Sequence, residues 1–120
     1  MTKQAYLDYF RTLPNVQTDQ PFDEDFNTWV IRHKVSRKWM GIVMLHNGED
    51  IVNLKCDPME ADFLRKAFEG VTEAFHMNKT HWISVYLGSD VPDEELKRMT
   101  MNSYKLTQAK KDRDALKDGG

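Results

Sequence analysis

Apolar and polar side chains alternate through residues 27–34, which is typical of a half-buried β-strand. Residues 39–46 are apolar at almost every position, as in a strand buried on both faces, and residues 51–56 form another apolar run. Asn47 and Gly48 separate these two runs, and both residue types tolerate the positive φ of a type I′ hairpin turn. The pattern predicts three consecutive antiparallel strands.

Helical spacing of apolar residues predicts three helices. The first covers residues 2–13, with Thr2 as its N-cap. The second begins at Asp57, an N-cap residue that is followed by Pro and, three residues after the cap, by Glu. The third opens at Pro92 with acids in its first turn, where they favour the helix dipole. Its expected buried face consists of Leu96, Met99, Ser103 and Leu106.

The remaining segments connect these elements. We expect Gly70 to end the second helix in the left-handed conformation, and residues 71–77 and 82–87 alternate as two more short strands. Residues 14–26 contain two prolines and an acidic cluster with little periodicity, so we expect no regular element there. From residue 108 onward apolar residues become rare, which predicts a frayed polar tail.

These elements predict an α+β fold, with an antiparallel sheet of about five strands, a meander plus a later strand pair, packed on one face by helices. The chain has 120 residues, of which 40% are hydrophobic, and this is enough for one packed core. We expect a single domain of residues 1–107, followed by the tail of residues 108–120.

Composition and charge narrow the functional classes. Cys56 is the only cysteine, so no intrachain disulfide can form, which fits a reducing compartment. No window approaches the ~20 apolar residues of a membrane span, and we expect a cytoplasmic protein that does not bind membranes. The net charge of −2 argues against a uniformly basic surface, but residues 27–56 hold five basic and two acidic residues. Any anion-binding face should lie on this middle segment.

Basic residues surround the predicted tip of the first hairpin. A two-stranded ribbon can approach a nucleic-acid groove while such residues contact phosphates. The alternative is a solvated sheet edge on which Lys and Arg prevent aggregation. The candidate phosphate-binding residues are Arg32, Lys34, Arg37, Lys38 and Lys55.

A second polar cluster precedes the last predicted strand and consists of His76, Asn78, Lys79, His81 and Trp82. Lys79 would attract an anion, the amide and imidazoles would donate hydrogen bonds, and the indole would stack on a base. The alternative is an ordinary strand connection in which the tryptophan is core and the asparagine shapes the turn.

Metal binding and catalysis have little support in the sequence. His76 and His81, together with Cys56, are too few soft ligands for a typical transition-metal site, and the acids at residues 23–25 lack calcium-loop spacing. There is no Gly-rich phosphate loop, nucleophile elbow or paired-histidine metalloprotease motif. We therefore expect no catalytic residues, no cofactor and no enzyme activity; the weaker alternative is an enzyme that uses His76 or His81 as its acid-base group.

Several motifs together resemble the MmcQ/YjbR family of small bacterial proteins. The resemblance covers about residues 22–107, and its most specific part is Asn-Lys-x-x-Trp, followed by Tyr-Leu and then Pro-Asp. The motifs are the Trp29 to Cys56 meander, Lys55 before Asp57-Pro58, the stretch from His76 to Trp82 with Val85-Tyr86-Leu87, and Pro92-Asp93 leading to Ser103-Tyr104.

The resemblance implies a double-wing fold, similar to that of frataxin-like (CyaY-like) proteins, and a DNA-binding role inferred from fold. Iron handling is a further implication of the frataxin likeness, but residues 2–13 contain only one acid, Asp8. The leading hypothesis is a non-catalytic nucleic-acid-binding protein, monomeric or weakly dimeric. The second is a domain that binds an anionic small molecule or a protein near Lys79 and Trp82.

Overall fold

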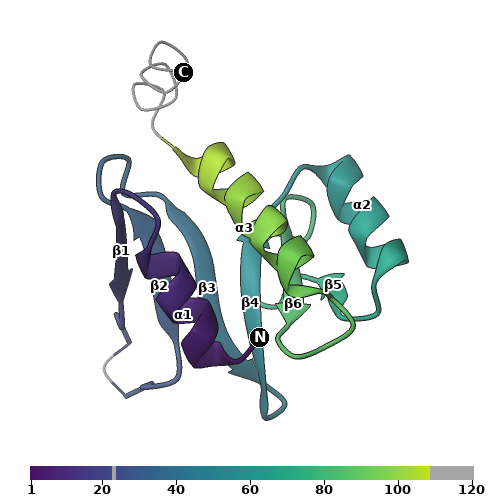
Figure 1. The fold of residues 1–120 in the computed structure, drawn as a ribbon, viewed down its shortest axis with the longest axis horizontal. Helices are drawn as coiled ribbons and strands as arrows, with labels where there is room; N and C mark the ends of the chain where they lie inside the picture. Colours follow the sequence, from purple (N-terminus) through teal and green to yellow (C-terminus); the bar gives the residue numbers. More distant parts are fainter. Residues whose placement is uncertain (23, 109–120) are drawn as a thin grey trace.

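The computed structural model describes residues 1–22 and 24–108, and it shows a six-stranded antiparallel sheet with three helices (Figure 1). The strands lie in the order β1-β2-β3-β4-β6-β5. The predicted α+β class is therefore confirmed. The elements are α1 (Lys3–Arg11), β1 (Val16–Asp19), β2 (Trp29–His33), β3 (Trp39–His46), β4 (Glu49–Lys55), α2 (Pro58–Ala67), β5 (Val71–Glu73), β6 (Trp82–Tyr86) and α3 (Asp93–Thr107).

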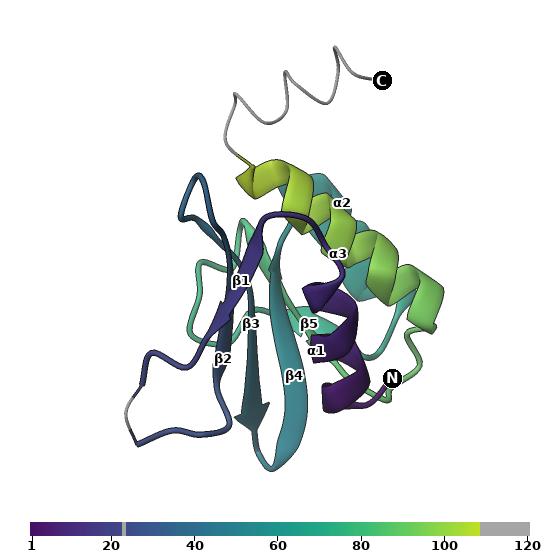
Figure 2. The ribbon, with the colours of Figure 1, turned by 60° about the vertical axis from the view of Figure 1, so that its left-hand side comes forward.

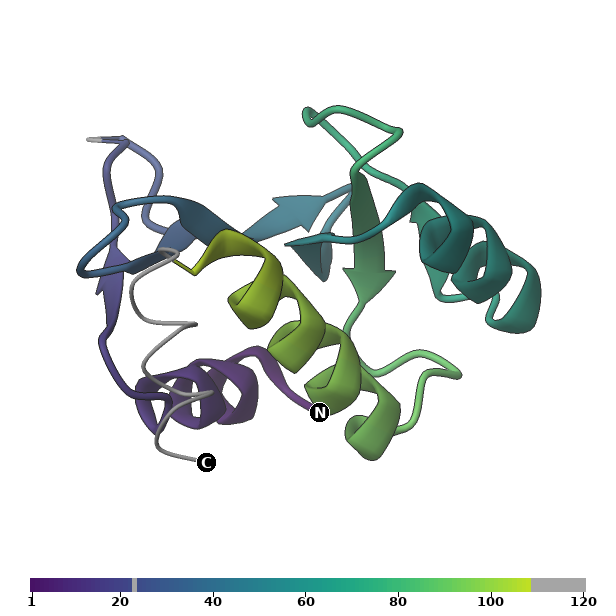
Figure 3. The same ribbon diagram turned by 90° about the horizontal axis from the view of Figure 1, so that it is seen from above.

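Helices α1 and α3 lie on the same side of the sheet (Figure 2). Seen from above, α2 lies beside the β5–β6 end, and residues 20–22, 24–28 and 74–81 rise on the side opposite α1 and α3 (Figure 3). One hydrophobic core joins the helices to the sheet, because apolar stripes on the helices meet alternate residues of the strands. Its largest fully buried members include Tyr6, Phe10, Ile31, Leu54, Leu64 and Ile83.

Strand β1 was not predicted, because residues 14–26 were expected to hold no regular element. Val16 to Asp19 pair with His33 to Val30 of β2 and form the edge of the sheet. All four β1 residues are half-buried, so they lack the buried and exposed alternation that marks a strand in sequence. Four residues at a sheet edge are too short for the pattern to be recognised.

The β3–β4 hairpin has the predicted turn. Asn47 has a φ of 52° and Gly48 a φ of 79°, as a type I′ turn requires. This turn fixes the register of the two strands, in which His46 lies opposite Glu49 and Gly41 opposite Leu54. The two central strands of the sheet therefore follow from a local sequence signal.

The start of α2 was predicted correctly, but its end was not. Asp57 is the N-cap and Pro58 the first helical residue, although the Asp57 side chain makes no capping hydrogen bond. The helix ends at Ala67, and Gly70 does not have a positive φ. A Cβ at Gly70 would lie 2.0 Å from Ser89 Oγ, so this glycine is required for close chain approach rather than for a left-handed cap.

Three further boundaries differ little from expectation. Helix α1 begins after Thr2, whose side chain accepts a hydrogen bond from the Ala5 amide at 3.1 Å, as predicted. Strand β5 ends at Glu73 rather than at residue 77, because the Phe75 amide donates to Ser84 Oγ at 3.0 Å instead of continuing the ladder. Gln108, the first residue of the predicted tail, is buried, and residues 109–120 lie outside the described residues.

Ser103 of α3 joins the helix to the two central strands. Its fully buried hydroxyl donates to the carbonyl of Met40 on β3 and accepts from the amide of Lys55 on β4 at 3.0 Å. At this end of the sheet the last paired residues of β3 and β4 are Gly41 and Leu54. The Ser103 hydroxyl therefore bridges the next two residues, Met40 and Lys55, where a backbone hydrogen bond between the strands would otherwise lie. One side chain thus satisfies a buried donor and a buried acceptor on neighbouring strands.

We predict that Ser103→Ala lowers the free energy of unfolding by about 2–4 kcal/mol, because it leaves two backbone groups without partners at about 1–3 kcal/mol each. Urea denaturation measures this change. Thr12→Ala is the matched control, since it removes an exposed hydroxyl that donates to the Tyr9 carbonyl, and it should change stability by less than about 0.5 kcal/mol. A Ser103→Ala protein as stable as the control would contradict the bridging role.

Candidate nucleic-acid interface

Exposed cations gather where β2 turns into β3. Lys34, Arg37 and Lys38 are exposed on this turn, residues 34–38, which we call the hairpin tip. Arg37 has a positive φ of 65°, which helps the chain to reverse, and its amide donates to the His33 carbonyl at 3.1 Å. The predicted polar tip is present, and its basic side chains face solvent.

The hairpin tip is fixed to the end of α3. Ser36 Oγ donates to the Thr107 carbonyl at 3.0 Å, and it accepts from the Lys38 amide at 3.2 Å. The buried His33 ring places Nε2 2.9 Å from the Tyr104 carbonyl oxygen and 2.9 Å from Thr107 Oγ1. These contacts hold the tip in one position relative to the core, so its charges are presented by a rigid support.

Two more cations lie at the same end of the molecule. Lys55 is the last residue of β4, and Lys105 lies in the last turn of α3. Within residues 1–22 and 24–108, none of these cations lies within ion-pair distance of an acid. We call this set the basic end: Lys34, Arg37, Lys38, Lys55 and Lys105.

Cations elsewhere are often neutralised by neighbouring acids. Arg11 pairs with Asp8 at 3.5 Å, and Arg98 pairs with Glu60 at 2.9 Å and with Glu95 at 3.0 Å. Lys66 likewise lies 2.9 Å from a carboxylate oxygen, that of Asp62. The basic end therefore stands out less by its number of cations than by their lack of acidic partners among the described residues.

Acidic residues lie at the opposite end of the sheet. Strand β4 begins there with Glu49, and Ile51 pairs with Tyr86, the last residue of β6. A cavity of about 350 Å³ at this end is lined by Glu49, Glu69, Gly70, Tyr86, Ser89 and Asp90. The five cations of the basic end and these acids thus lie at opposite ends of the sheet, which would orient the protein toward a polyanion.

Arg32, a predicted phosphate contact, has a different environment from the basic end. Its Nε lies 2.7 Å from Asp19 Oδ2, and its side chain is only 18% exposed. Its guanidinium also lies 5.9 Å from the ring centre of Trp39. The geometry makes Arg32 a support for Trp39, with its charge balanced by β1, rather than an open phosphate contact.

The second predicted site is an exposed connection between β5 and β6. Asn78 Oδ1 accepts from the amides of Thr80 at 2.8 Å and His81 at 3.1 Å, so this asparagine shapes the turn. Lys79 Nζ donates to the Ala74 carbonyl at 2.7 Å. His76, with a φ of 65°, and His81 are exposed, whereas Trp82 is half-buried.

This connection is anchored to the sheet face opposite α1 and α3. Asn53 of β4 donates to the Phe75 carbonyl at 2.7 Å, and Ser84 of β6 donates to Asn53 Oδ1. The Phe75 ring stacks on His46 with ring centres 3.6 Å apart. No residue of the connection lines the cavity at the acidic end of the sheet or the cavity between α2 and α3.

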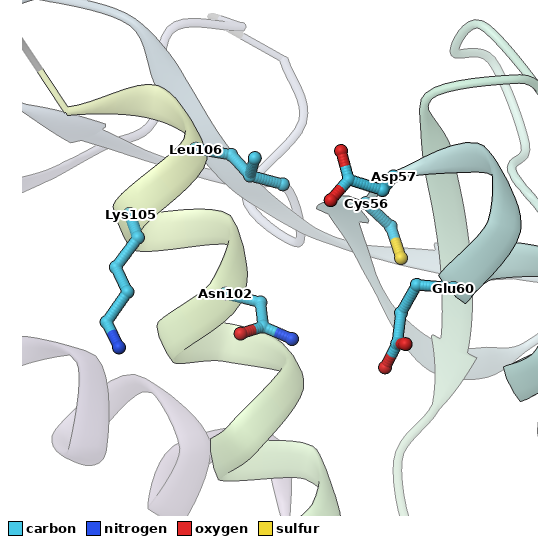
Figure 4. A pocket seen from close by; sticks show the side chains of 6 residues that line it. All are labelled: Cys56, Asp57, Glu60, Asn102, Lys105 and Leu106. Atoms are coloured by element: carbon cyan, nitrogen blue, oxygen red, sulfur yellow. The ribbon is translucent and has the colours of Figure 1, made fainter.

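A cavity of about 190 Å³ lies between α2 and α3 (Figure 4). In the close-up view, Asn102 points toward Cys56 and Glu60, whereas Lys105 points away from them. Glu60 is already paired with Arg98 at 2.9 Å. The lining residues are Cys56, Asp57, Glu60, Asn102, Lys105 and Leu106.

The Cys56 thiol in this cavity is a poor nucleophile. Burial, assisted by the nearby carboxylates of Glu60 and Asp57, raises its pKa from 9.0 to about 11. The thiol is therefore almost entirely protonated at neutral pH, and the thiolate is the reactive form. Cys56 contributes to packing, since its side chain is 5% exposed.

Residues 1–22 and 24–108 contain neither a membrane-spanning helix nor a cluster of metal ligands. No helix there is long and apolar enough to cross a membrane. No group of three or more His, Cys, Asp or Glu side chains in the same residues is arranged to hold a metal ion.

The sequence did not indicate two residues near the candidate interface. The apolar pattern of the third helix predicts only its buried face, and the contribution of Lys105 depends on where that helix ends relative to the sheet. The sequence pattern places Trp39 in an apolar strand. Its pairing with Arg32 depends on a register shift between Ile31 and Arg32, which no local pattern reveals.

The fold and the candidate site define a small α+β protein with a six-stranded antiparallel sheet and a basic end. A family model, YjbR, matches residues 11–106. The chain belongs to the YjbR family, as its sequence motifs suggested.

Curated relatives and solved structures support this assignment. The uncharacterised protein YyaQ of Bacillus subtilis (strain 168) is 30% identical over 118 residues, covering 90% of this chain and 99% of YyaQ. The uncharacterised protein YjbR of Escherichia coli (strain K12) is 30% identical over 104 residues, covering 87% of this chain and 85% of its own length.

Two solved structures have the same fold. A crystal structure of a Pseudomonas syringae protein has a TM-score of 0.83 and 29% identity, covering 90% of this chain and 100% of its own. The Deinococcus radiodurans protein DR2400, described as a DUF419 domain, has a TM-score of 0.80 and 26% identity, covering 96% of this chain and 87% of its own.

The raised thiol pKa predicts slow alkylation of Cys56. A shift from 9.0 to about 11 lowers the thiolate fraction at pH 8 about 100-fold relative to an unshifted thiol. Iodoacetamide labelling of native protein should therefore be at least about 100-fold slower than labelling in urea, and the native rate should rise with pH up to about 11. Comparable rates in the two conditions would show that the thiol is neither buried nor shifted.

Proposed function

We propose that this protein is a non-catalytic nucleic-acid-binding protein of the cytoplasm, which contacts phosphates with its basic end. The observation that carries the proposal is the gathering of five cations without acidic partners among the described residues at one end of the sheet. Phosphate groups are the partners that such a set would neutralise, with release of counterions as the driving force.

The hairpin tip supplies most of the contact in this proposal. Lys34, Arg37 and Lys38 are exposed at the end of a two-stranded ribbon whose tip is hydrogen-bonded to the end of α3. A ribbon of this kind can lie along a phosphate backbone, and its attachment to α3 reduces the entropy lost on binding. The acidic opposite end would turn away from the polyanion and favour one orientation.

The second hypothesis places an anionic small molecule or a protein at Lys79 and Trp82. In the structure the Lys79 ammonium is already bonded to the Ala74 carbonyl, so a ligand would have to compete for it. The geometry therefore favours the basic end as the phosphate-binding surface.

The proposal predicts salt-dependent binding that weakens when the hairpin tip loses charge. Fluorescence anisotropy with labelled DNA and RNA, across a range of salt concentrations, should give a steep linear loss of log affinity with log salt. Arg37→Gln combined with Lys38→Gln should reduce the slope on duplex by about 1.8, since each phosphate contact contributes about 0.9. Affinity at low salt should fall about tenfold or more.

A matched control removes two positive charges elsewhere. Lys66 is paired with Asp62, and Lys97 Nζ lies 5.3 Å from the Tyr9 ring centre on α1, so neither belongs to the basic end. Lys66→Gln combined with Lys97→Gln should change slope and affinity little. Equal losses in the two double variants would mean that net charge alone drives binding, and no binding at low salt would refute the proposed function.

A further inference from the structure

Trp82 lies on the sheet face opposite α1 and α3. Its neighbour Ile83 belongs to the hydrophobic core, so Trp82 points to the other face, as alternate residues of a strand do. Trp82 pairs directly with Lys55 of β4, and residues paired in this way share a face. Both side chains are half-buried, so part of each is open to solvent.

Trp39 reaches the same face because the β2–β3 pairing is irregular. Ile31 lies opposite Gly41, but Arg32 lies opposite Trp39, so β3 contains one extra residue, Met40. In a regular strand Trp39, two residues before Gly41, would share the face of Gly41, whose Cβ position is 3.2 Å from Phe10 of α1. A bulge of this kind re-aims a side chain, and such bulges are common beside functional sites.

Trp39 is also held in orientation from one side. The Arg32 guanidinium lies 5.9 Å from the Trp39 ring centre, and Arg32 Nε lies 2.7 Å from Asp19 Oδ2. Strand β1 thus fixes the arginine, and the arginine supports the indole. A ring fixed in this way loses little further entropy when a second ring stacks on it.

Lys55 stands between the two tryptophans at the basic end. Trp39 begins β3 and Trp82 begins β6, and β4 lies between these strands. Neighbouring strands are about 4.8 Å apart, so the backbones of β3 and β6, which carry the two tryptophans, are about 10 Å apart across the sheet. Neighbouring bases of an extended, unstacked strand can span this distance while the phosphate between them meets the Lys55 ammonium.

We infer that the sheet face opposite α1 and α3 binds single-stranded nucleic acid, with bases stacked on Trp39 and Trp82 and a phosphate at Lys55. This inference rests on the proposed function and specifies the form of nucleic acid. The hairpin tip, which leads directly into Trp39, extends the phosphate path with Arg37 and Lys38.

A single strand suits this face better than a duplex. Bases of a duplex stack on one another, and their faces are closed to an indole, whereas every unpaired base offers a face that stacks on an aromatic ring. Residues 20–22, 24–28 and 74–81 rise from the sheet on this same side (Figure 3). Raised segments on this side disfavour a wide rigid duplex more than a flexible strand.

The first experiment compares single-stranded and duplex binding in variants of each tryptophan, using oligothymidylate of roughly 15 nucleotides and a duplex of equal length. Trp39→Leu and Trp82→Leu should each weaken single-strand binding at least about fivefold, and leave duplex binding within about twofold. Trp29→Phe is the control, because Trp29 belongs to the other face and packs against the core. Unchanged single-strand affinity in both leucine variants would overturn the inference.

A fluorescence titration tests the same point with the tryptophans intact. The chain has three tryptophans, so Trp29→Phe leaves only Trp39 and Trp82 as emitters. Oligothymidylate should quench this emission with the same midpoint as anisotropy, and a blunt duplex should not. Salt-dependent binding without quenching would overturn the inference and leave the proposed function standing. No anisotropy change with any nucleic acid at low salt would overturn both.

Discussion

A single buried hydroxyl, that of Ser103, lies where helix α3 meets the two central strands, and it bonds to a carbonyl on β3 and an amide on β4. The residues it holds, Met40 and Lys55, are the extra residue of the β3 bulge and the central cation of the candidate interface. Loss of a buried partner costs more than the bond itself contributes, so the helix and both strand ends are constrained together. The positions of Trp39 and Lys55 both depend on this constraint.

The surface charge of this protein depends as much on which cations form ion pairs with acids as on where the cations lie in the sequence. Cations on the three helices are mostly matched by acids three or four residues away or on a neighbouring helix, as Arg98 is by Glu95 and Glu60. Such exposed pairs add little stability, but they remove local positive potential. Within residues 1–22 and 24–108 the hairpin tip has no such partners, so this part of the weakly acidic chain still presents a positive end. Net charge therefore says little about what this protein binds.

Local signals determined how much of the fold could be predicted. The Asn47-Gly48 turn and the Asp57-Pro58 helix start were predicted because each demands particular residue types at adjacent positions. The end of α2 was predicted wrongly because the requirement for Gly70 comes from Ser89, which is distant in sequence. The candidate site could be predicted only in part. The cluster of basic residues is visible in the sequence, whereas the pairing of each cation with an acid depends on the folded chain.

Strand β1, which the sequence pattern did not predict, also changes the role of Arg32. In sequence Arg32 is one more cation on a basic hairpin, but Asp19 on the unpredicted strand lies 2.7 Å from its Nε. An arginine paired in this way keeps its planar guanidinium for stacking while its charge is largely offset, so it can hold an indole without repelling a neighbouring lysine. Strand β1, the ion pair between Asp19 and Arg32, and the bulge in β3 together determine the position of the Trp39 side chain. The same short strand that escaped the sequence pattern thus shapes the surface on which unpaired bases would stack.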